Sequence, residues 1–261
     1  MPTAPRISRP PPSWDSYRAT WDRMQERYVP EREPRFAAIC DILAEELPRS
    51  ARILDLGTGL GSLAERIARR MPSARIVAVD HDPVLLRIAR ESLGELGSRI
   101  RWVDLDLRWS GWAEALPRGR YDAVVSTTAL HWLRRPELHR LHRVLFDRIR
   151  PGGLFLNGDH IPFAPDAARI GAMLRGIRQR YQRRELHRRP GATWNGWWAS
   201  AARDPRLATE VALRRQRYPR EHHDVANDHL PAWLRSLRSA GFREAEVAWQ
   251  LWDDRIVMAV R

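Results

Sequence analysis

The sequence predicts an α/β fold, in which a parallel sheet is covered by helices on both faces and continues into a C-terminal antiparallel hairpin. Three observations lead to this prediction. Strand-like and helix-like segments alternate between residues 50 and 159, a glycine-rich turn follows the first strand, and two strand-like segments lie near residue 261. Near-continuous apolar strands separated by helices are typical of parallel sheets that are buried on both sides.

The individual elements follow from apolar periodicity and from turn residues. Strands are expected at Ile53–Leu56, Arg75–Val79, Ile100–Leu105, Tyr121–Ser126 and Leu154–Asn157. Helices are expected at Ser62–Met71, Pro83–Leu93 and Pro136–Ile149, with a turn at 150–153 before the fifth strand. Helical spacing without strands then extends to about residue 227 and is followed by a helix over 228–240. Two last strands, Glu244–Trp249 and Arg255–Val260, are expected to form a hairpin around Asp253 and Asp254.

Composition limits the class of protein. The chain has 261 residues, 43% of them hydrophobic, which is enough for a globular core. Residues 1–13 are rich in proline and are expected to form a disordered tail. The longest run without a charged residue, 190–202, is shorter than the ~20 residues of a membrane span, so no membrane partner is expected. Cys40 is the single cysteine, which excludes an internal disulfide and favours a reducing cytoplasm.

Charge is concentrated in one segment. All 45 basic residues are arginine, for which codon bias in a GC-rich genome is the simplest explanation, and the net charge is +13. Between Arg169 and Arg220 there are 14 arginines against Glu185, Asp204 and Glu210, so this segment carries +11. Such a segment is compatible with RNA binding. Its arginines are interleaved with apolar residues at helical spacing, which favours solvated helix faces for most of them.

The segment DLGTGLG, residues 55–61, indicates a nucleotide-bearing cofactor. Dinucleotide loops typically read G-x-G-x-x-G, whereas this loop reads G-x-G-x-G. Asp55 would repel a pyrophosphate, but a carboxylate can hold the ammonium group of S-adenosylmethionine directly or through water. Asp80, at the end of the second strand, is placed to accept hydrogen bonds from ribose hydroxyls with either cofactor. The loop and the C-terminal hairpin therefore favour S-adenosylmethionine over NAD.

Six ordered segments resemble the class I S-adenosylmethionine-dependent methyltransferases. They are DLGTGLG, VAVDHDPVLL, RIRWVDLDL, YDAVVSTTALHWL, LRPGGLFLNGDH and LRSAGFREAEV. The ALHWL stretch is similar to the small-molecule branch that includes trans-aconitate and juvenile-hormone-acid methyltransferases. The resemblance implies a Rossmann-like sheet of seven strands with its core at 14–159 and 228–261. It also implies that 160–227 forms a helical cap, rich in Arg and Trp, over the substrate site.

The same resemblance implies roles for individual residues. The methionine part of the cofactor would lie against Asp55, Gly57, Thr58, Gly59, Gly61, Ser126 and Thr127. Arg35 would bind the methionine carboxylate, with a solvated helix face as the alternative. Asp80 would hold the ribose, His81 would flank the adenine, and Asp106 and Leu107 would contact the adenine edge, with Asp104 as a rival to Asp106.

Catalytic and substrate-binding residues are less specified. His131 and His160 follow the fourth and fifth strands and are candidate general bases, because histidine exchanges protons near neutral pH. Tyr17, Trp21, Trp197 and His223 are candidate substrate-binding residues, and packing is the alternative for the aromatic ones. His222 and His223 are adjacent and point in different directions, so no metal site is expected.

Three functions remain open from the sequence. The leading hypothesis is methyl transfer to a small molecule, for which an anionic or carboxylate-bearing acceptor suits the arginines. The second is an RNA methyltransferase. The third is a cofactor-binding protein of the same fold without methyl transfer. Neither the acceptor atom nor the oligomeric state is encoded in a recognisable motif.

Overall fold

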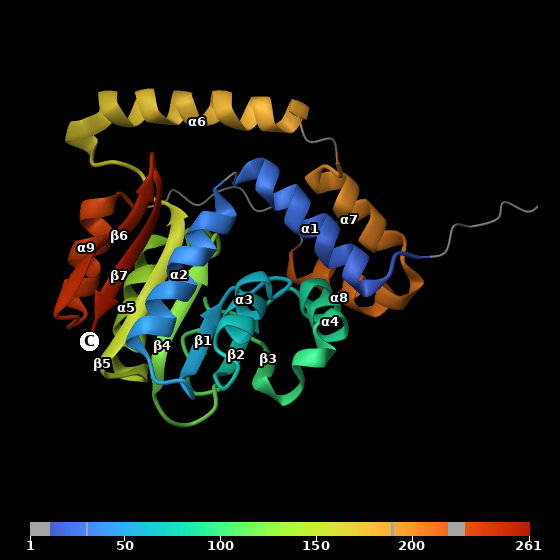
Figure 1. The fold of residues 1–261 in the computed structure, drawn as a ribbon, viewed down its shortest axis with the longest axis horizontal. Coiled ribbons are helices and arrows are strands. Elements are labelled where there is room, and N and C mark those ends of the chain that lie inside the picture. Colours follow the sequence, from blue (N-terminus) through green and yellow to red (C-terminus); the bar gives the residue numbers. More distant parts are fainter. Residues whose placement is uncertain (1–10, 30, 189–190, 219–227) are drawn as a thin grey trace, which may run out of the picture.

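A central sheet organises the molecule. The computed structural model describes residues 11–29, 31–188, 191–218 and 228–261, and within them seven strands form one sheet in the order β3-β2-β1-β4-β5-β7-β6 (Figure 1). The strands are β1 (Arg52–Leu56), β2 (Arg75–Asp80), β3 (Ile100–Asp104), β4 (Tyr121–Thr127), β5 (Ile149–His160), β6 (Glu244–Leu251) and β7 (Asp254–Val260). The first five pair in parallel, whereas β7 runs antiparallel to both β5 and β6. The predicted fold class is confirmed.

Helices cover both faces of the sheet. They are α2 (Arg32–Glu46), α3 (Ser62–Arg70), α4 (Pro83–Ser92), α5 (Arg135–Arg148) and α9 (Leu230–Ser239), with a 3-10 helix, η1 (Gly94–Arg99), between α4 and β3. Ile53 packs in the core with α2 and α3, and its neighbour Leu54 packs in the core with α5 and α9. Successive residues of a strand point to opposite faces, so the continuous apolar sequence of β1 reflects burial on both sides.

The strands β5 and β7 differ in detail from their predicted bounds. The turn expected at 150–153 lies inside β5, because Gly152 donates its N–H to the carbonyl of Arg261 at 2.8 Å. The carbonyl of Gly153 in turn accepts from the Arg261 N–H at 3.0 Å. Local turn rules consider only neighbouring residues, so they cannot predict that Gly152 and Gly153 pair with Arg261 at the far end of the sequence. The hairpin turn lies one residue earlier than predicted, at 252–253, where Trp252 has a φ of 57°.

Four further helices lie beyond the carboxyl ends of the strands. They are α1 (Trp14–Tyr28), α6 (Ala168–Arg188), α7 (Trp194–Arg203) and α8 (Ala208–Arg217), with the short 3-10 helices η3 (Pro165–Ala167) and η4 (Pro205–Leu207). Tyr17, Trp21 and Trp197 form a buried aromatic cluster between α1 and α7.

Among the described helices, none has an apolar stretch long enough to cross a bilayer. Of the expected disordered tail, residues 1–10 lie outside the described residues, and Ser13 caps α1.

A buried ion pair connects α2 to the hairpin. The Arg35 side chain is fully buried, and its Nη1 lies 2.6 Å from Oδ1 of Asp254 at the start of β7. Gly158 of β5 leaves room for this side chain, because an added Cβ would lie 2.9 Å from Cδ of Arg35. Removing one member of a buried pair leaves the other charge uncompensated in a low-dielectric environment. Arg35 therefore has a structural role, because it joins α2 to the sheet.

We expect Arg35→Ala to lower the free energy of unfolding by about 3–5 kcal/mol, because the buried Asp254 carboxylate loses its partner. Chemical denaturation followed by circular dichroism measures this change. Arg70→Ala is the matched control, since the Arg70 side chain is 51% exposed and its pair with Asp41 lies at the surface. A stable Arg35→Ala variant that loses affinity for S-adenosylhomocysteine would contradict the structural assignment and favour a cofactor contact.

Candidate functional site

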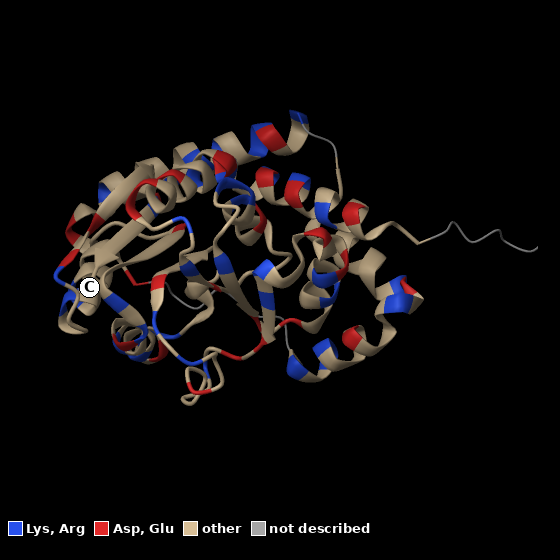
Figure 2. Cartoon of the chain, turned by 60° about the horizontal axis from the view of Figure 1, so that its bottom comes forward, with Lys and Arg blue, Asp and Glu red and all other residues tan. Residues whose placement is uncertain are grey.

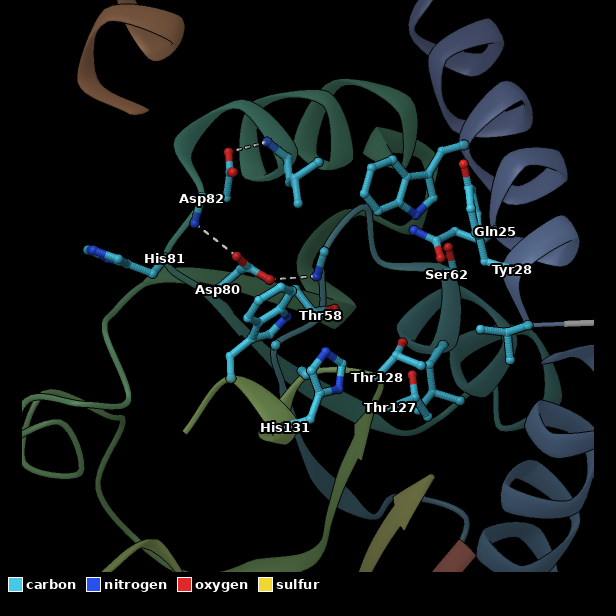
Figure 3. A pocket seen from close by; sticks show the side chains of 18 of the residues that line it. Gln25, Tyr28, Thr58, Ser62, Asp80, His81, Asp82, Thr127, Thr128 and His131 are labelled. Carbon is cyan, nitrogen blue, oxygen red and sulfur yellow. Dashed lines mark hydrogen bonds between the residues drawn. The ribbon is translucent and has the colours of Figure 1, made fainter. Parts of the chain in front are cut away.

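A cavity of about 910 Å³ lies where β1, β2 and β4 end, between the sheet and helices α1, α6, α7 and α8. Figure 3 shows Thr58 and Asp80 from the sheet side and Gln25 and Tyr28 from α1 around this space. Ligands of parallel α/β sheets typically bind at the carboxyl ends of the strands. The architecture therefore places this cavity at the position where such a fold binds its ligand.

The glycine loop forms one wall of the cavity. Gly57, Thr58 and Gly59 line it. Gly57 has a φ of 69°, and a Cβ there would overlap the Cβ of Ala129, so only glycine fits. Gly59 has a φ of 57°, and an added Cβ would meet no atom within 4 Å, so the space in front of its backbone is open. This open cradle fits a ligand that approaches the backbone closely.

Gly61 has a different role from the one expected. It is not among the described residues that line the cavity. Its φ of 76° begins α3, and an added Cβ would lie 2.5 Å from the ring of Trp102. Gly61 is required for packing of the loop on β3, so the expectation that it lines the methionine part of the cofactor is not supported.

Asp55 and Ser126 lie behind the cavity wall. Neither is found among the lining residues of the described chain. The Asp55 carboxylate accepts a 2.6 Å hydrogen bond from Oγ1 of Thr58, and burial raises the pKa of the Asp55 carboxyl to about 7. The Ser126 hydroxyl donates to the carbonyl of Leu56 at 2.8 Å. Both side chains stabilise the strand ends, and the direct cofactor contacts expected for them are not supported.

Asp80 lines the cavity at the end of β2. Its carboxylate accepts hydrogen bonds from the backbone N–H of Gly59 at 2.7 Å and from that of Asp82 at 2.8 Å (Figure 3). Burial raises the pKa of the Asp80 carboxyl to about 6. Each carboxylate oxygen retains acceptor capacity, so Asp80 can orient the glycine loop and still accept hydrogen bonds from a ligand.

Asp104 and Asp106, at and after the end of β3, differ in whether they line the cavity. His81, Asp106 and Leu107 line the cavity, as the sequence predicts. Asp104 is absent from the described lining residues, and its carboxylate instead pairs with Arg217 at 2.8 Å. The ring of His81 lies between the two carboxylates, with Nε2 3.6 Å from Asp106 and Nδ1 3.7 Å from Asp104. Asp106 thus reaches the cavity, and its contact with the adenine edge stays a prediction.

The segment after β4 contributes lining residues that the sequence did not single out. Thr127 lines the cavity as expected, and Thr128 and Ala129 line it as well. Thr128 has a φ of 49°, a conformation that is uncommon for a β-branched residue. The strained backbone turns the chain directly in front of Gly57. The only sequence signal for these two residues is their position immediately after the fourth strand.

His131 and Asp159 form a pair at the cavity wall. Nδ1 of His131 lies 2.9 and 3.0 Å from the two carboxylate oxygens of Asp159. His131 lines the cavity, whereas Asp159 is buried behind it. Burial alone would raise the pKa of the Asp159 carboxyl, but His131, His160 and Arg35 together outweigh this effect and the pKa is lowered. An ionised carboxylate therefore fixes the imidazole and directs Nε2 away from itself.

His160 also lines the cavity, close to the same carboxylate. Its backbone N–H donates to Oδ1 of Asp159 at 2.8 Å. Burial lowers the pKa of the His160 imidazole. Both predicted histidines thus reach the cavity, and the side chain of His131 bonds directly to Asp159. Sequence reasoning did not identify Asp159, because its pairing with residue 131 depends on the parallel alignment of β4 and β5.

The aromatic residues divide into lining and packing groups. Trp21 lines the cavity, whereas Tyr17 and Trp197 are not among the described lining residues. The Tyr17 hydroxyl donates to Asp204 at 3.1 Å, and the Trp197 indole N–H donates to the Tyr17 carbonyl at 3.1 Å. The expectation that these two bind substrate is therefore corrected to packing between α1 and α7. His223 lies outside the described residues.

The helices beyond the sheet supply further lining residues. Gln25 and Tyr28 of α1, Gln182 of α6 and Asn195 of α7 were not predicted. Trp194 and Trp198 of α7 and Tyr218 after α8 belong to the aromatic residues of 160–227, which the sequence suggests as an apolar wall of the substrate site. Helical periodicity in the sequence indicates which residues share a face. It does not indicate which face meets a cavity formed by distant elements. In the part of the chain that the structure describes, no group of three or more histidine, cysteine or acidic residues is arranged to hold a metal ion.

Part of the chain is similar in sequence to known methyltransferases. Residues 53–153 match the family described as a methyltransferase domain. The trans-aconitate 2-methyltransferase of Azoarcus sp. (strain BH72) is 35% identical over 136 residues, which cover 52% of this chain and 49% of that protein. The malonyl-[acyl-carrier protein] O-methyltransferase of Geobacter sulfurreducens is 38% identical over 122 residues, covering 46% of this chain and 39% of that protein. The chain thus spans about half, or less, of the length of these relatives.

Solved structures agree on the fold. The pyocyanin biosynthetic protein PhzM superposes with a TM-score of 0.56 at 17% identity, covering 96% of this chain and 62% of that one. Human N-acetylserotonin methyltransferase, solved with S-adenosylmethionine, superposes with a TM-score of 0.54 at 17% identity, covering 94% of this chain and 57% of that one. These solved structures share the fold of the described chain, and residues 53–153 match a methyltransferase domain in sequence.

Proposed function

We propose that this chain transfers a methyl group from S-adenosylmethionine to a small-molecule acceptor. The observation that carries the proposal is the single cavity shared by the glycine loop, Asp80 and the His131–Asp159 pair. Relatives named trans-aconitate 2-methyltransferase and malonyl-[acyl-carrier protein] O-methyltransferase support this class of reaction. Their different acceptors leave the acceptor of this chain to be identified from its own residues.

The residues on the sheet side fit the cofactor. The open backbone at Gly59 and Thr58 would lie against the methionine part, and Thr127 closes the same side. Asp80 would accept hydrogen bonds from the ribose hydroxyls, and His81, Asp106 and Leu107 would surround the adenine. When bound, S-adenosylmethionine supplies a methyl group activated by a positively charged sulfur. The protein then has to position the acceptor and exclude water.

The helices α6, α7 and α8 would act as the cap over the acceptor. They supply the wall of the cavity that faces the ends of the strands. If the acceptor carries a hydroxyl proton, Nε2 of His131 would take it while Asp159 stabilises the resulting imidazolium. The arrangement resembles other pairs in which a carboxylate orients a basic imidazole. His131 is thus the favoured general base, and His160 would shape the cavity beside it.

Cofactor identity is tested by calorimetry with S-adenosylhomocysteine and NAD. We expect binding of S-adenosylhomocysteine and no binding of NAD. Asp80→Ala should weaken the affinity for S-adenosylhomocysteine by ~10–100-fold, because two buried hydroxyls lose a charged acceptor. Asp41→Ala is the control, since the Asp41 side chain is 66% exposed. Binding of NAD without binding of S-adenosylhomocysteine would refute the cofactor assignment.

The same titration has an expected pH dependence. Asp80 is ionised above its pKa of about 6 and protonated below it. A protonated carboxyl offers fewer acceptor sites to the ribose. The affinity for S-adenosylhomocysteine should therefore fall as the pH decreases through 6, and Asp80→Ala should remove this dependence.

His131→Ala should lower turnover by ~10²–10⁴-fold while the affinity for S-adenosylhomocysteine is kept, because only proton removal is lost. Asp159→Asn should cause a smaller loss, since the imidazole remains but its orientation and charge stabilisation are weakened. Steady-state kinetics with isotope-labelled cofactor measure both effects, with His160→Ala as the comparison. Wild-type rates in His131→Ala would show that catalysis depends on positioning alone.

The basic surface of α6 supports RNA as a second candidate acceptor. Six arginines of this helix are exposed: Arg169, Arg175, Arg180, Arg183, Arg184 and Arg188. Figure 2 nevertheless shows acidic residues interspersed with basic ones along the described helices. The small-molecule function is therefore favoured.

The salt dependence of activity separates the two acceptors. RNA binding should lose affinity with a log–log slope of about −0.7 per phosphate contact on single strands. Acceptor binding within a cavity should show a shallow slope, because few counterions are released. We expect the shallow slope in assays with total RNA and with small acceptors at two salt concentrations. Specific RNA methylation that is lost steeply with salt would favour the second candidate.

A further inference from the structure

The arginines that line the cavity are matched by carboxylates. Four arginines are found among the described lining residues, and each has an acidic partner at short distance. The pairs are Arg32–Asp22 at 2.9 Å, Arg108–Asp106 at 2.8 Å, Arg178–Asp253 at 2.9 Å and Arg214–Asp82 at 2.6 Å. Asp80 adds a further carboxylate at the wall. The described cavity therefore does not share the strong positive charge of the whole chain, which is +13.

An anionic acceptor would have to share a guanidinium group with one of these carboxylates, which already neutralises its charge. The acidic partners of Arg178 and Arg214 are buried, with side-chain exposures of 5% for Asp253 and 7% for Asp82. Separating such a pair leaves a carboxylate desolvated without its counter-charge, which is unfavourable. Arg214 is fixed further by stacking, because its guanidinium carbon lies 3.7 Å from the ring centroid of Trp198. The paired arginines thus favour an acceptor without a carboxylate.

Aromatic side chains offer the surface that such an acceptor would contact. Tyr28, Trp132 and Trp194 line the cavity and yet are 36%, 40% and 40% exposed. Trp21 and Trp198 extend this wall, with ring centroids 5.5 and 5.9 Å from that of Trp194. Exposed aromatic faces within a cavity gain free energy when an apolar ring displaces water from them. Amide groups of Gln25 and Asn195 provide neutral hydrogen bonding at the same cavity.

The His131–Asp159 pair also favours an acceptor without a carboxylate. A carboxylic acid with a pKa near 4 is already ionised at neutral pH and needs no base before it accepts a methyl group. A ring hydroxyl with a pKa near 10 retains its proton and does need one. The buried carboxylate of Asp159, held at Nδ1 of His131, therefore has a use with a hydroxyl acceptor that it lacks with a carboxylate acceptor.

We propose that the acceptor is an uncharged molecule with an aromatic or similarly planar apolar ring that carries a hydroxyl group. This inference rests on the proposed function, since it names the acceptor class of the same site. The acceptor oxygen would lie beside His131, which takes the hydroxyl proton. As the oxygen bonds to the methyl carbon, the bond between that carbon and the sulfonium of S-adenosylmethionine breaks, its electron pair stays on sulfur, and S-adenosylhomocysteine leaves. The rings of Trp194, Trp198 and Trp21 would contact its apolar body.

Matched probes test the charge preference. Calorimetry with the protein saturated by S-adenosylhomocysteine compares 2-naphthol with 2-naphthoate, which share a ring system and differ in charge. We expect 2-naphthol to bind at least tenfold more tightly than 2-naphthoate or trans-aconitate. Equal or tighter binding of either carboxylate would overturn the proposal.

Two variants locate the preference in the described residues. Trp194→Ala should weaken 2-naphthol binding by about tenfold, because an aromatic wall is lost. Trp109→Ala is the matched control, because Trp109 is 55% exposed and is not among the described lining residues. Asp253→Asn should tighten 2-naphthoate binding by about tenfold and leave 2-naphthol unchanged, because Arg178 loses its carboxylate partner. Unchanged 2-naphthol binding in Trp194→Ala would contradict the proposed ring contact.

Methyl transfer, followed separately with labelled cofactor, distinguishes this inference from the proposed function. Selective binding of 2-naphthol without transfer to any hydroxyl acceptor would support the ring preference of the cavity but refute the enzymatic function. Efficient transfer to trans-aconitate or another carboxylate would support the function and overturn the acceptor class.

Discussion

The whole site depends on the close approach of two strand-end loops. Gly57 after β1 and Ala129 after β4 are so near each other that a side chain on residue 57 would overlap Ala129. The backbone conformation of Gly57 and the positive φ of Thr128 are both required for this contact. Because the two loops meet here, Gly59, Thr127 and His131 open onto one cavity. The cofactor side and the acceptor side of the proposed site thus meet where Gly57 lies against Ala129.

Acidic residues determine how the arginine-rich segment behaves. Arg178, Arg214 and Arg217 belong to the basic part of the chain, yet each meets a carboxylate from the sheet side, namely Asp253, Asp82 and Asp104. These pairs attach α6 and α8 to the hairpin and to the loops after β2 and β3. The remaining exposed arginines of α6 face solvent. A cap rich in positive charge can therefore cover a cavity that holds little net charge.

The tryptophans of α7 divide between packing in the core and lining the cavity. Trp197 is 2% exposed and joins Tyr17 in the core between α1 and α7, whereas Trp194, one helical turn earlier, is 40% exposed at the cavity. Burial of Trp197 supplies the stability that lets Trp194 and Trp198 present their rings to the cavity. The spacing WNGWW places these roles on one helix face, since residues three and four apart are neighbours.

The sequence by itself determined the order of the strands and helices, the glycine loop and the residues at the strand ends. Gly57, Asp80, Asp106 and His131 were identifiable because local rules fix where a strand ends and a turn begins. Tertiary structure alone decided what each side chain meets. Arg35 is buried against Asp254, which is 219 positions away, and Asp159 reaches His131 only because β4 and β5 lie side by side. Periodicity specifies the face of an element, whereas its partner is chosen by packing of the whole chain.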